Sequence, residues 1–493
     1  MKLPHSGECT VYTMPLKTER KASFHEPLVL EQVRISQQNW ARTALGKRLA
    51  LLRRFRRRIA RTGAELAQTV PCEQPGALHR GVTDTLVSEV LPLAEACRFL
   101  EREAAHILAS QRLSTRSRPL WLRGVTAETR REPLGVVLII GPANYPLFLP
   151  GVQTLQALAA GNAVLWKPPP GGSAAAEALR EMLVECGLDP ALLQVLDEST
   201  EAATDAIAAG VDKVFLTGSA ATGAEILYQM APRLTPSVME LSGCDAVFVL
   251  PGANVDRTVA ALAFGLRLNG SATCMAPRRL FLVGSHPSLL AALREKLDLV
   301  SPVPLPARTR SHLDDLLSEA RRLGGEVLED GSIVLIRNAT AEMQIARTDI
   351  FAPVLCIFEV PDVKAALAAH APCPYALTAA IFGPEAEAHA LASRVQVGTV
   401  QINDVIVATA DPRVSFGGRK SSGFGLTRGR EGLLEMTALK TIVTQSSRTL
   451  RAYQPTTPAH VTFFATYLEI AHGGWSARWR GLGEFLRAAA RLK

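Results

Sequence analysis

Residues 213–223 read Lys-Val-Phe-Leu-Thr-Gly-Ser-Ala-Ala-Thr-Gly, a run of apolar residues that ends in a glycine-rich turn. The run 213–217 predicts a buried strand that ends in the glycine turn 218–223, and the helical stretch 224–230 follows directly. A strand, a glycine turn and a helix N-terminus in this order form an anion site that suits a pyrophosphate. A G-S-x-x-x-G match is weak by itself, so the rest of the chain must support it.

Two further strands are expected upstream of this stretch. The apolar run 135–140 predicts one, and it is followed by a turn, Gly-Pro-Ala-Asn-Tyr-Pro, that carries Asn144. Residues 163–168 predict the other, with Lys167 at its carboxyl end. Strands alternate with helical stretches from 135 to 300, which predicts an α/β fold with a doubly wound parallel sheet.

Composition narrows the class of protein. The chain has 493 residues, of which 47% are hydrophobic and 20% charged, values typical of a soluble globular protein of about two to four domains. Its eight cysteines show no paired spacing, which predicts neither a disulfide framework nor a metal site. No signal pattern and no long apolar run is present in the sequence, so we expect a cytoplasmic protein.

Two reactive side chains lie downstream. Glu240 ends a predicted strand in Val-Met-Glu-Leu-Ser-Gly, and Cys274 lies among small residues in Asn-Gly-Ser-Ala-Thr-Cys-Met-Ala-Pro. An exposed thiolate attacks carbonyl carbon, and a carboxylate in the same pocket activates water against a thioester. The amide of Asn144 can donate to an oxyanion. Each residue also has an ordinary alternative: a buried thiol, a salt-bridged carboxylate and a turn-forming asparagine.

Taken in order, the motifs resemble those of the aldehyde dehydrogenase superfamily from about residue 33 to 444. The sequences Leu-Thr-Pro at 234–236 and Cys-x-Ala-Pro at 274–277 are most similar to the branch that oxidises fatty and aromatic aldehydes. The motifs that carry the resemblance are P-x-N-Y-P (142–146), Lys-Pro (167–168), T-G-S-x-x-x-G (217–223), Glu-Leu (240–241), C-x-A (274–276), Phe-Ala-Pro (351–353) and Ser-Phe-Gly-Gly-Arg-Lys-Ser-Ser-Gly (415–423).

The resemblance implies a role for each candidate. Cys274 would attack the aldehyde, while Asn144 and the backbone amide of Cys274 hold the oxyanion. After hydride transfer to a nicotinamide, Glu240 would activate the water that releases the acid. The implied cofactor is NAD or NADP, and no metal is expected. The implied cofactor-binding residues are Lys167, Gly218, Ser219, Gly223, Leu241, Asp349 and Phe351.

Departures from the family pattern leave alternatives open. Pro170 replaces a carboxylate that grips the adenosine ribose, so we expect NADP to be used as well as NAD, and Asp349 is one methylene shorter than the usual glutamate. Ala143 leaves space where a bulky aromatic is common, which favours a hydrophobic aldehyde. One rival function is that of an acylating or reductive relative that uses CoA or an acyl thioester. The presence of Glu240 argues against this rival. Another is a catalytically degenerate binding subunit.

The resemblance also implies an organisation and an assembly. The arm would pair with a strand near 438–445 of a second subunit, giving a homodimer or homotetramer. The apolar positions 49, 52, 55 and 59 follow helical spacing, so the arginines around them are expected on a solvated face and no nucleic-acid partner is expected. The segments are a helical part (1–116), the oligomerisation arm (117–132), a dinucleotide-binding domain (133–240), a catalytic domain (241–435), an oligomerisation strand (436–448) and a basic amphipathic tail (449–493).

The tail has two interpretations. Positions 475, 479, 482 and 486 are apolar at helical spacing and alternate with arginines. Such a stripe can pack onto the domain or cover the substrate entrance. Tryptophan together with arginine also suits a membrane interface, which would make the protein peripheral to the membrane. The net charge of +8 favours acidic surfaces without choosing among them.

Overall fold

The computed structural model describes residues 26–71, 80–122, 124–297, 304–329, 333–447, 453 and 455–491. The chain divides into two compact units. The larger comprises Met1–Ala109 and Arg131–Leu439, and the smaller comprises Ser110–Arg130 and Lys440–Lys493. None of the described helices combines the length and apolar character that a membrane span requires.

A six-stranded sheet forms the first half of the larger unit. Five of its strands are parallel, and β17 runs antiparallel to β7. The strands predicted at 135–140, 163–168 and 213–217 are confirmed, and the doubly wound α/β fold with them. In spatial order the strands are β17 (Gly423–Phe424), β7 (Ser237–Glu240), β6 (Lys213–Thr217), β3 (Val136–Ile140), β4 (Ala163–Lys167) and β5 (Leu193–Val195).

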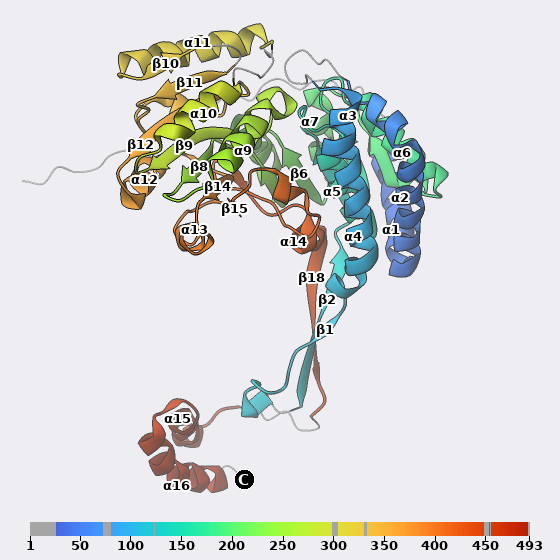
Figure 1. Ribbon diagram of the computed structural model, residues 1–493. Helices are drawn as coiled ribbons and strands as arrows, with labels where there is room; N and C mark the ends of the chain where they lie inside the picture. The colour runs from blue at the N-terminus through green and yellow to red at the C-terminus, as the bar shows by residue number, and fades with distance from the viewer. Residues whose placement is uncertain are drawn as a thin grey trace, which may run out of the picture. The chain divides into compact units, whose positions relative to one another are not determined.

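Helices cover both faces of this sheet (Figure 1). On one face lie α5 (Phe148–Ala160) and α6 (Ser173–Glu185), backed by α2 (Leu45–Gln68) and α4 (Leu91–Ile107). On the other face lie α1 (Glu26–Arg42), α7 (Thr200–Ala209) and α8 (Ala220–Met230). The short helix α3 (Val82–Thr85) and the π-helical turn η1 (Leu86–Val90) lead into α4.

The arginine-rich helix α2 only partly fits its prediction. The predicted apolar face is buried, because Leu49, Leu52, Phe55 and Ile59 are all in the core. The expectation of a solvated arginine face is wrong in part. Arg53 and Arg56 both pair with Glu101 of α4, and Arg54 donates to the backbone carbonyl of Cys186 at 2.8 Å. These arginines therefore join α2 to α4 and to the end of α6.

A seven-stranded sheet forms the second half of the larger unit. It is parallel except for β10, with α9 (Val255–Arg267) and α10 (Pro287–Leu297) on one face. The other face is covered by α11 (Ala307–Arg322), α12 (Val363–His370) and α13 (Glu385–Ala392). In spatial order the strands are β10 (Glu326–Leu328), β11 (Val334–Arg337), β12 (Val354–Val360), β9 (Pro277–Val283), β8 (Asp245–Val249), β14 (Thr378–Phe382) and β15 (Thr399–Ile402).

The smaller unit holds a three-stranded sheet and a helical pair. The sheet has the order β1 (Gln111–Arg112), β2 (Val125–Pro133) and β18 (Thr437–Gln445). The arm and the late strand therefore pair within one chain, which corrects the expectation that a second subunit supplies the strand. Helices α15 (Ala459–His472) and α16 (Trp475–Arg491) pack together through stacked Phe463 and Phe485 rings, 4.9 Å apart.

Candidate active site

Four of the predicted site residues meet at one edge of the six-stranded sheet. Asn144 follows β3, Lys167 ends β4, Gly218 follows β6 and Glu240 ends β7. The register places Ile140 beside Lys167 and Thr217 beside Glu240. Carboxyl ends of parallel strands form the crevice in which doubly wound sheets bind ligands.

A pocket of about 270 Å³ contains the predicted nucleophile and base. Glu240 reaches it from the end of β7, and Cys274 from the loop between η5 (Leu268–Ser271) and β9. Most of its wall is apolar, including Val87, Phe148, Leu149, Phe264, Ile406 and Phe416. Ala143 is not part of that wall, so the expectation that it opens the substrate space is wrong.

Glu240 is a buried carboxyl with one oxygen engaged and one free. Its Oε2 accepts from the hydroxyls of Thr217 at 3.4 Å and Thr427 at 3.3 Å. Its Oε1 has no hydrogen-bond partner among the described residues. Burial raises the pKa of Glu240, while the charge of Arg428 and the two hydroxyls act in the opposite direction. A carboxyl poised in this way is suited to general-base chemistry.

Cys274 is partly exposed, whereas four of the other described cysteines are buried. Burial within the site raises the pKa of the Cys274 thiol, and Glu240, Asp245 and Asp349 raise it further by their negative charge. The positive charge of Arg428 lowers it. Cys274 therefore offers a partly exposed thiol to the pocket, and the charge of Arg428 offsets only part of the rise in its pKa.

The turn with Asn144 and the loop with Cys274 are bonded to each other. The side-chain amide of Asn144 donates to the carbonyl of Ala272 at 2.9 Å, two residues before the thiol. In return, Asn269 donates to the carbonyl of Asn144 at 2.9 Å. Asn269 and Ser271 have φ values of +51° and +65°, an uncommon backbone for such residues. An amide nitrogen carries two N–H groups, so Asn144 keeps one donor for an oxyanion.

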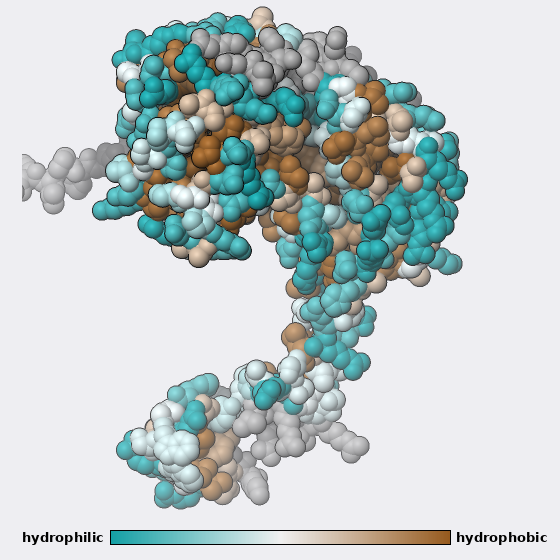
Figure 2. Space-filling model, in the orientation of Figure 1, coloured by the Kyte–Doolittle hydropathy of each residue, from teal (hydrophilic) through white to brown (hydrophobic). Residues whose placement is uncertain are grey.

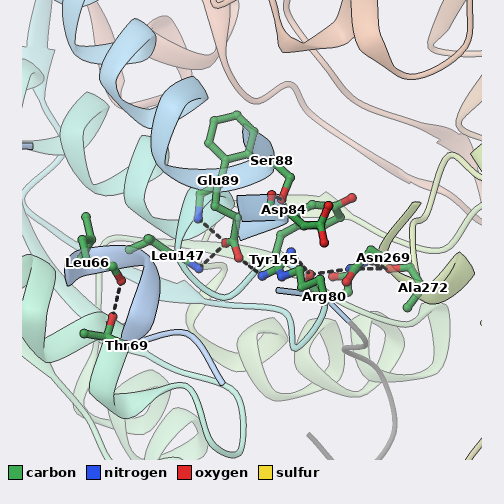
Figure 3. Close-up of polar contacts among 12 residues, drawn as sticks. Leu66, Thr69, Arg80, Asp84, Ser88, Glu89, Tyr145, Leu147, Asn269 and Ala272 are labelled. Carbon is green, nitrogen blue, oxygen red and sulfur yellow. Dashed lines mark hydrogen bonds and ion pairs between the residues drawn. The ribbon is translucent and has the colours of Figure 1, made fainter. Parts of the chain in front are cut away.

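A buried ion pair that the sequence analysis missed supports this turn (Figure 3). Glu89, in the π-helical turn η1, pairs with Arg80 and accepts the backbone N–H groups of Leu147 and Phe148, each at 2.8 Å. Arg80 also donates to the carbonyl of Asn144 at 3.4 Å. The only local signal was a glutamate inside the apolar run 86–93, which has no motif.

Thr427 and Arg428 were also missed. Both follow the recognised motif at 415–423, where no family pattern singled them out. Arg428 is 6% exposed, lines the pocket and donates through Nη1 to the carbonyl of Thr409 at 2.6 Å. Its guanidinium lies 4.5 Å from the ring centre of Phe416.

The predicted anion site is built around the start of α8. Ser219 precedes that helix and its hydroxyl accepts the backbone N–H of Thr222 at 3.1 Å. A Cβ added at Gly223 would lie 2.8 Å from Leu241, so this glycine lets α8 approach the end of β7 closely. Gly218 donates to the carbonyl of Glu240 at 3.0 Å. The glycine turn thus joins the start of α8 to the segment that carries Glu240.

Lys167 carries a largely buried ammonium group. Among the described residues it makes no hydrogen bond or ion pair, although it is only 9% exposed. Burial lowers its pKa, and the carboxylates of Glu198 and Asp197 oppose that effect. Glu198, which the sequence analysis missed, accepts backbone N–H groups of Gly171 and Ser173 at 2.7 and 2.9 Å. A carboxylate therefore stands near Lys167 despite Pro170.

Asp349 and Phe351 lie between η6 (Gln344–Arg347) and β12. Both residues are partly buried. Burial raises the pKa of Asp349, and a hydrogen bond from Ser242 and the charge of Arg278 partly offset that rise. Asp349 is close enough to Cys274 to influence its charge. Within the described part of the chain, no cluster of three or more His, Cys, Asp or Glu side chains has the geometry of a metal site.

The fold and the thiol–carboxylate pocket define an oxidoreductase of the dinucleotide-binding α/β class. The chain belongs to the aldehyde dehydrogenase family, whose sequence model matches residues 27–442. The resemblance found in the sequence is thereby confirmed, and the protein is an enzyme of the aldehyde dehydrogenase type.

Known relatives agree with this assignment. The chain is 28% identical to 4,4'-diapolycopene aldehyde oxidase of Methylomonas sp over 419 residues, which cover 81% of this chain and 79% of that protein. It is 31% identical to betaine aldehyde dehydrogenase 2 of Rhizobium meliloti, over 64% of this chain and 70% of that one. It is also similar to the NADP-dependent glyceraldehyde-3-phosphate dehydrogenase of Bacillus halodurans solved with NADP. That structure has a TM-score of 0.75 and 25% identity, and the match covers 85% of this chain and 90% of the other.

Proposed function

We propose that the protein oxidises a hydrophobic aldehyde to the carboxylic acid, with NAD or NADP as the oxidant. The observation that carries the proposal is the shared pocket: Cys274 and Glu240 line one cavity whose wall is mostly apolar. A thiol and a base in the same cavity suit formation of a thioester followed by its hydrolysis. Residues 133–240 would serve the cofactor and 241–435 the catalytic part.

The first step is nucleophilic attack. The thiolate of Cys274 bonds to the aldehyde carbon, and the carbonyl oxygen becomes an oxyanion. The free N–H of the Asn144 amide and the backbone N–H of Cys274 are the donors proposed for that oxygen. Removing one such donor typically costs about 10²–10³ in turnover. The bonds between the Asn144 turn and the Cys274 loop keep these donors near the thiol.

The residues at the sheet edge fit a dinucleotide. The start of α8 offers an anion site, and Lys167 offers an ammonium without a protein partner among the described residues. Asp349 and Phe351 are the groups proposed for the nicotinamide end. Bound NAD or NADP supplies the hydride acceptor that oxidises the thiohemiacetal to a thioester.

The last step is hydrolysis. Glu240 takes a proton from water, the water oxygen bonds to the thioester carbon, and the carbon–sulfur bond breaks. The carboxylic acid leaves and the thiolate of Cys274 is restored. This role for Glu240 argues against the CoA-dependent alternative, because a second thiol would need no hydrolytic base.

We also propose that the smaller unit serves assembly and membrane contact. Its sheet would join subunits of a homodimer or homotetramer of a cytoplasmic enzyme.

In α16, Trp475 and Trp479 are 77% and 66% exposed, and Arg478 and Arg480 lie between or beside them. Brown side chains reach the surface of this helical pair in Figure 2. Exposed tryptophan with arginine suits the headgroup region of a bilayer. Co-sedimentation with anionic vesicles tests this: Trp475→Ser/Trp479→Ser should stay in the supernatant, and wild-type protein that does not sediment would refute it.

The direct test of the catalytic proposal compares two cysteines. Purified wild-type enzyme is given a series of aldehydes with NAD and with NADP, and the reduced nicotinamide is followed by absorbance. Cys274→Ser should abolish oxidation while cofactor binding persists, and Cys244→Ser, which changes a buried thiol directly before β8, should remain active. Activity retained in Cys274→Ser would refute the proposal. A wild-type enzyme that binds the cofactor but oxidises none of the aldehydes would favour a degenerate subunit.

A further inference from the structure

Arg428 is a buried cation that makes no direct ion pair or hydrogen bond with a carboxylate of the described residues. Only 6% of the residue is exposed, and its sole hydrogen bond to the described residues is the one from Nη1 to the carbonyl of Thr409. Its Nε has no partner there. Phe416 and Phe148 lie against the guanidinium, with ring centres at 4.5 and 6.0 Å. Burying a cation without a directly bonded anion is costly, so the position of this charge needs a functional reason.

The backbone holds Arg428 in place at the pocket. Its φ is +60°, a strained value for a side chain with a Cβ, and such strain gathers at functional sites. The preceding residue, Thr427, donates to Glu240. Arg428 itself lines the same pocket as Glu240 and Cys274. The segment therefore supplies the catalytic base with a hydrogen bond and the pocket with a positive charge.

Three carboxylates act on Cys274, and another buried cation close to its loop, Arg278, is bound to Ser271 and to the carbonyl of Ala352. Glu240 at the end of β7, Asp245 of β8 and Asp349 before β12 all raise the pKa of the thiol, after the larger effect of burial. Asp84 of α3 adds a further carboxylate to the pocket wall. Arg428 opposes these effects: its charge lowers the pKa of both Cys274 and Glu240.

We propose that Arg428 is a positioning residue for the catalytic pair, whose guanidinium is the counter-charge for the thiolate of Cys274 and the carboxylate of Glu240. This inference rests on the proposed function, since it assigns those two residues their catalytic forms. Charges in a water-poor pocket are screened much less than at the surface. A hydrophobic substrate that displaces water would strengthen the interaction at the moment it is needed.

The test measures the ionisation of Cys274 without substrate or cofactor. The full-length protein is alkylated with iodoacetamide at a series of pH values, and modification of Cys274 is followed by peptide mass spectrometry. Arg428→Met should move the midpoint of the alkylation–pH curve upward by about one pH unit or more. At a pH below the midpoint, this shift makes alkylation of Cys274 about tenfold slower. Arg428→Lys, which keeps the charge, should stay near the wild-type curve. Arg430→Met, which removes an exposed arginine two residues away, is the control.

Two outcomes would overturn the proposal. One is an unchanged midpoint in Arg428→Met, and the other is an equal upward shift in Arg428→Lys. Arg428→Gln keeps an N–H donor for the carbonyl of Thr409, so it replaces Arg428→Met if that variant does not fold. The same upward shift is expected from it.

A second measurement identifies the rival explanation. Arg428 could instead hold a carboxylate at the far end of the substrate, so chain-matched aldehydes with and without a terminal carboxylate are compared. If Arg428→Met selectively loses oxidation of the carboxylated aldehyde and its alkylation curve is unchanged, Arg428 binds the substrate carboxylate and our assignment is wrong. Alkylation of Cys274 does not depend on aldehyde oxidation. A wild-type enzyme without activity would therefore refute the proposed function, while the alkylation test could still be interpreted.

Discussion

Glu240 shows at the scale of single residues how burial and hydrogen bonds set reactivity. Burial raises its pKa, and the hydroxyl of Thr427 favours the charged form. Since the base must be ionised, turnover should fall as pH decreases through this raised pKa. Thr427→Val removes a donor worth about 0.5–1.5 kcal/mol, so the acidic limb of the rate–pH profile should move about 0.4–1 unit to higher pH. An unmoved limb, or one at lower pH, would contradict this account.

Cofactor choice is also decided by single residues. Pro170 lacks the carboxylate that would repel a 2′-phosphate, so NADP should be used within about tenfold of NAD, a difference below about 1.4 kcal/mol. Pro170→Glu should then favour NAD. Initial rates with each cofactor provide the measurement. A wild-type preference for NAD of about a thousandfold would show that another group, Glu198 beside Lys167, reads the ribose.

At the scale of elements, the segment from α3 to α4 supports the turn with Asn144 from outside the sheet. Glu89 is fully buried, pairs with Arg80 and accepts the backbone N–H groups of Leu147 and Phe148 at the start of α5. Glu89→Gln removes the carboxylate charge from a buried ion pair that also accepts two backbone N–H groups, which should lower the free energy of unfolding by about 3–5 kcal/mol. Glu95→Gln, in an exposed pair with Arg98, should cost below about 1 kcal/mol. Urea unfolding of both variants gives the comparison, and equal effects would refute the assignment.

The sequence predicted these elements where the pattern was local. The strands at 135–140, 163–168 and 213–217 were readable, because apolar runs ended in glycine or polar turns. Asn144, Lys167, Gly218 and Glu240 followed from their places at strand ends. Glu89 bonds to the turn after Asn144, and Arg428 lines the pocket, each from a distant segment, and no local period encodes such contacts. The arginines of α2 were misjudged for the same reason, since their partners in α4 and α6 are set by packing.

At the scale of the whole molecule, substrate range should follow from the apolar pocket and the tail. Each buried substrate methylene contributes about 0.8 kcal/mol, roughly fourfold in specificity, until the pocket is filled. We therefore expect kcat/KM to rise from short to medium or long aldehydes. Truncation after Thr456 removes α15 and α16 and should selectively impair oxidation of long, membrane-bound aldehydes. A preference for acetaldehyde, or an equal loss at all chain lengths, would contradict the hydrophobic-substrate account.

Trapping the covalent intermediate tests whether Cys274 carries an acyl group that Glu240 hydrolyses. Glu240→Gln enzyme is mixed with NAD and an active aldehyde, and intact mass and nicotinamide absorbance are recorded together. We predict a burst of about one reduced cofactor per active site and a mass increase equal to the acyl group, located on Cys274 by peptide mapping. Turnover at the wild-type rate, with no burst and no acyl group on Cys274, would contradict the account.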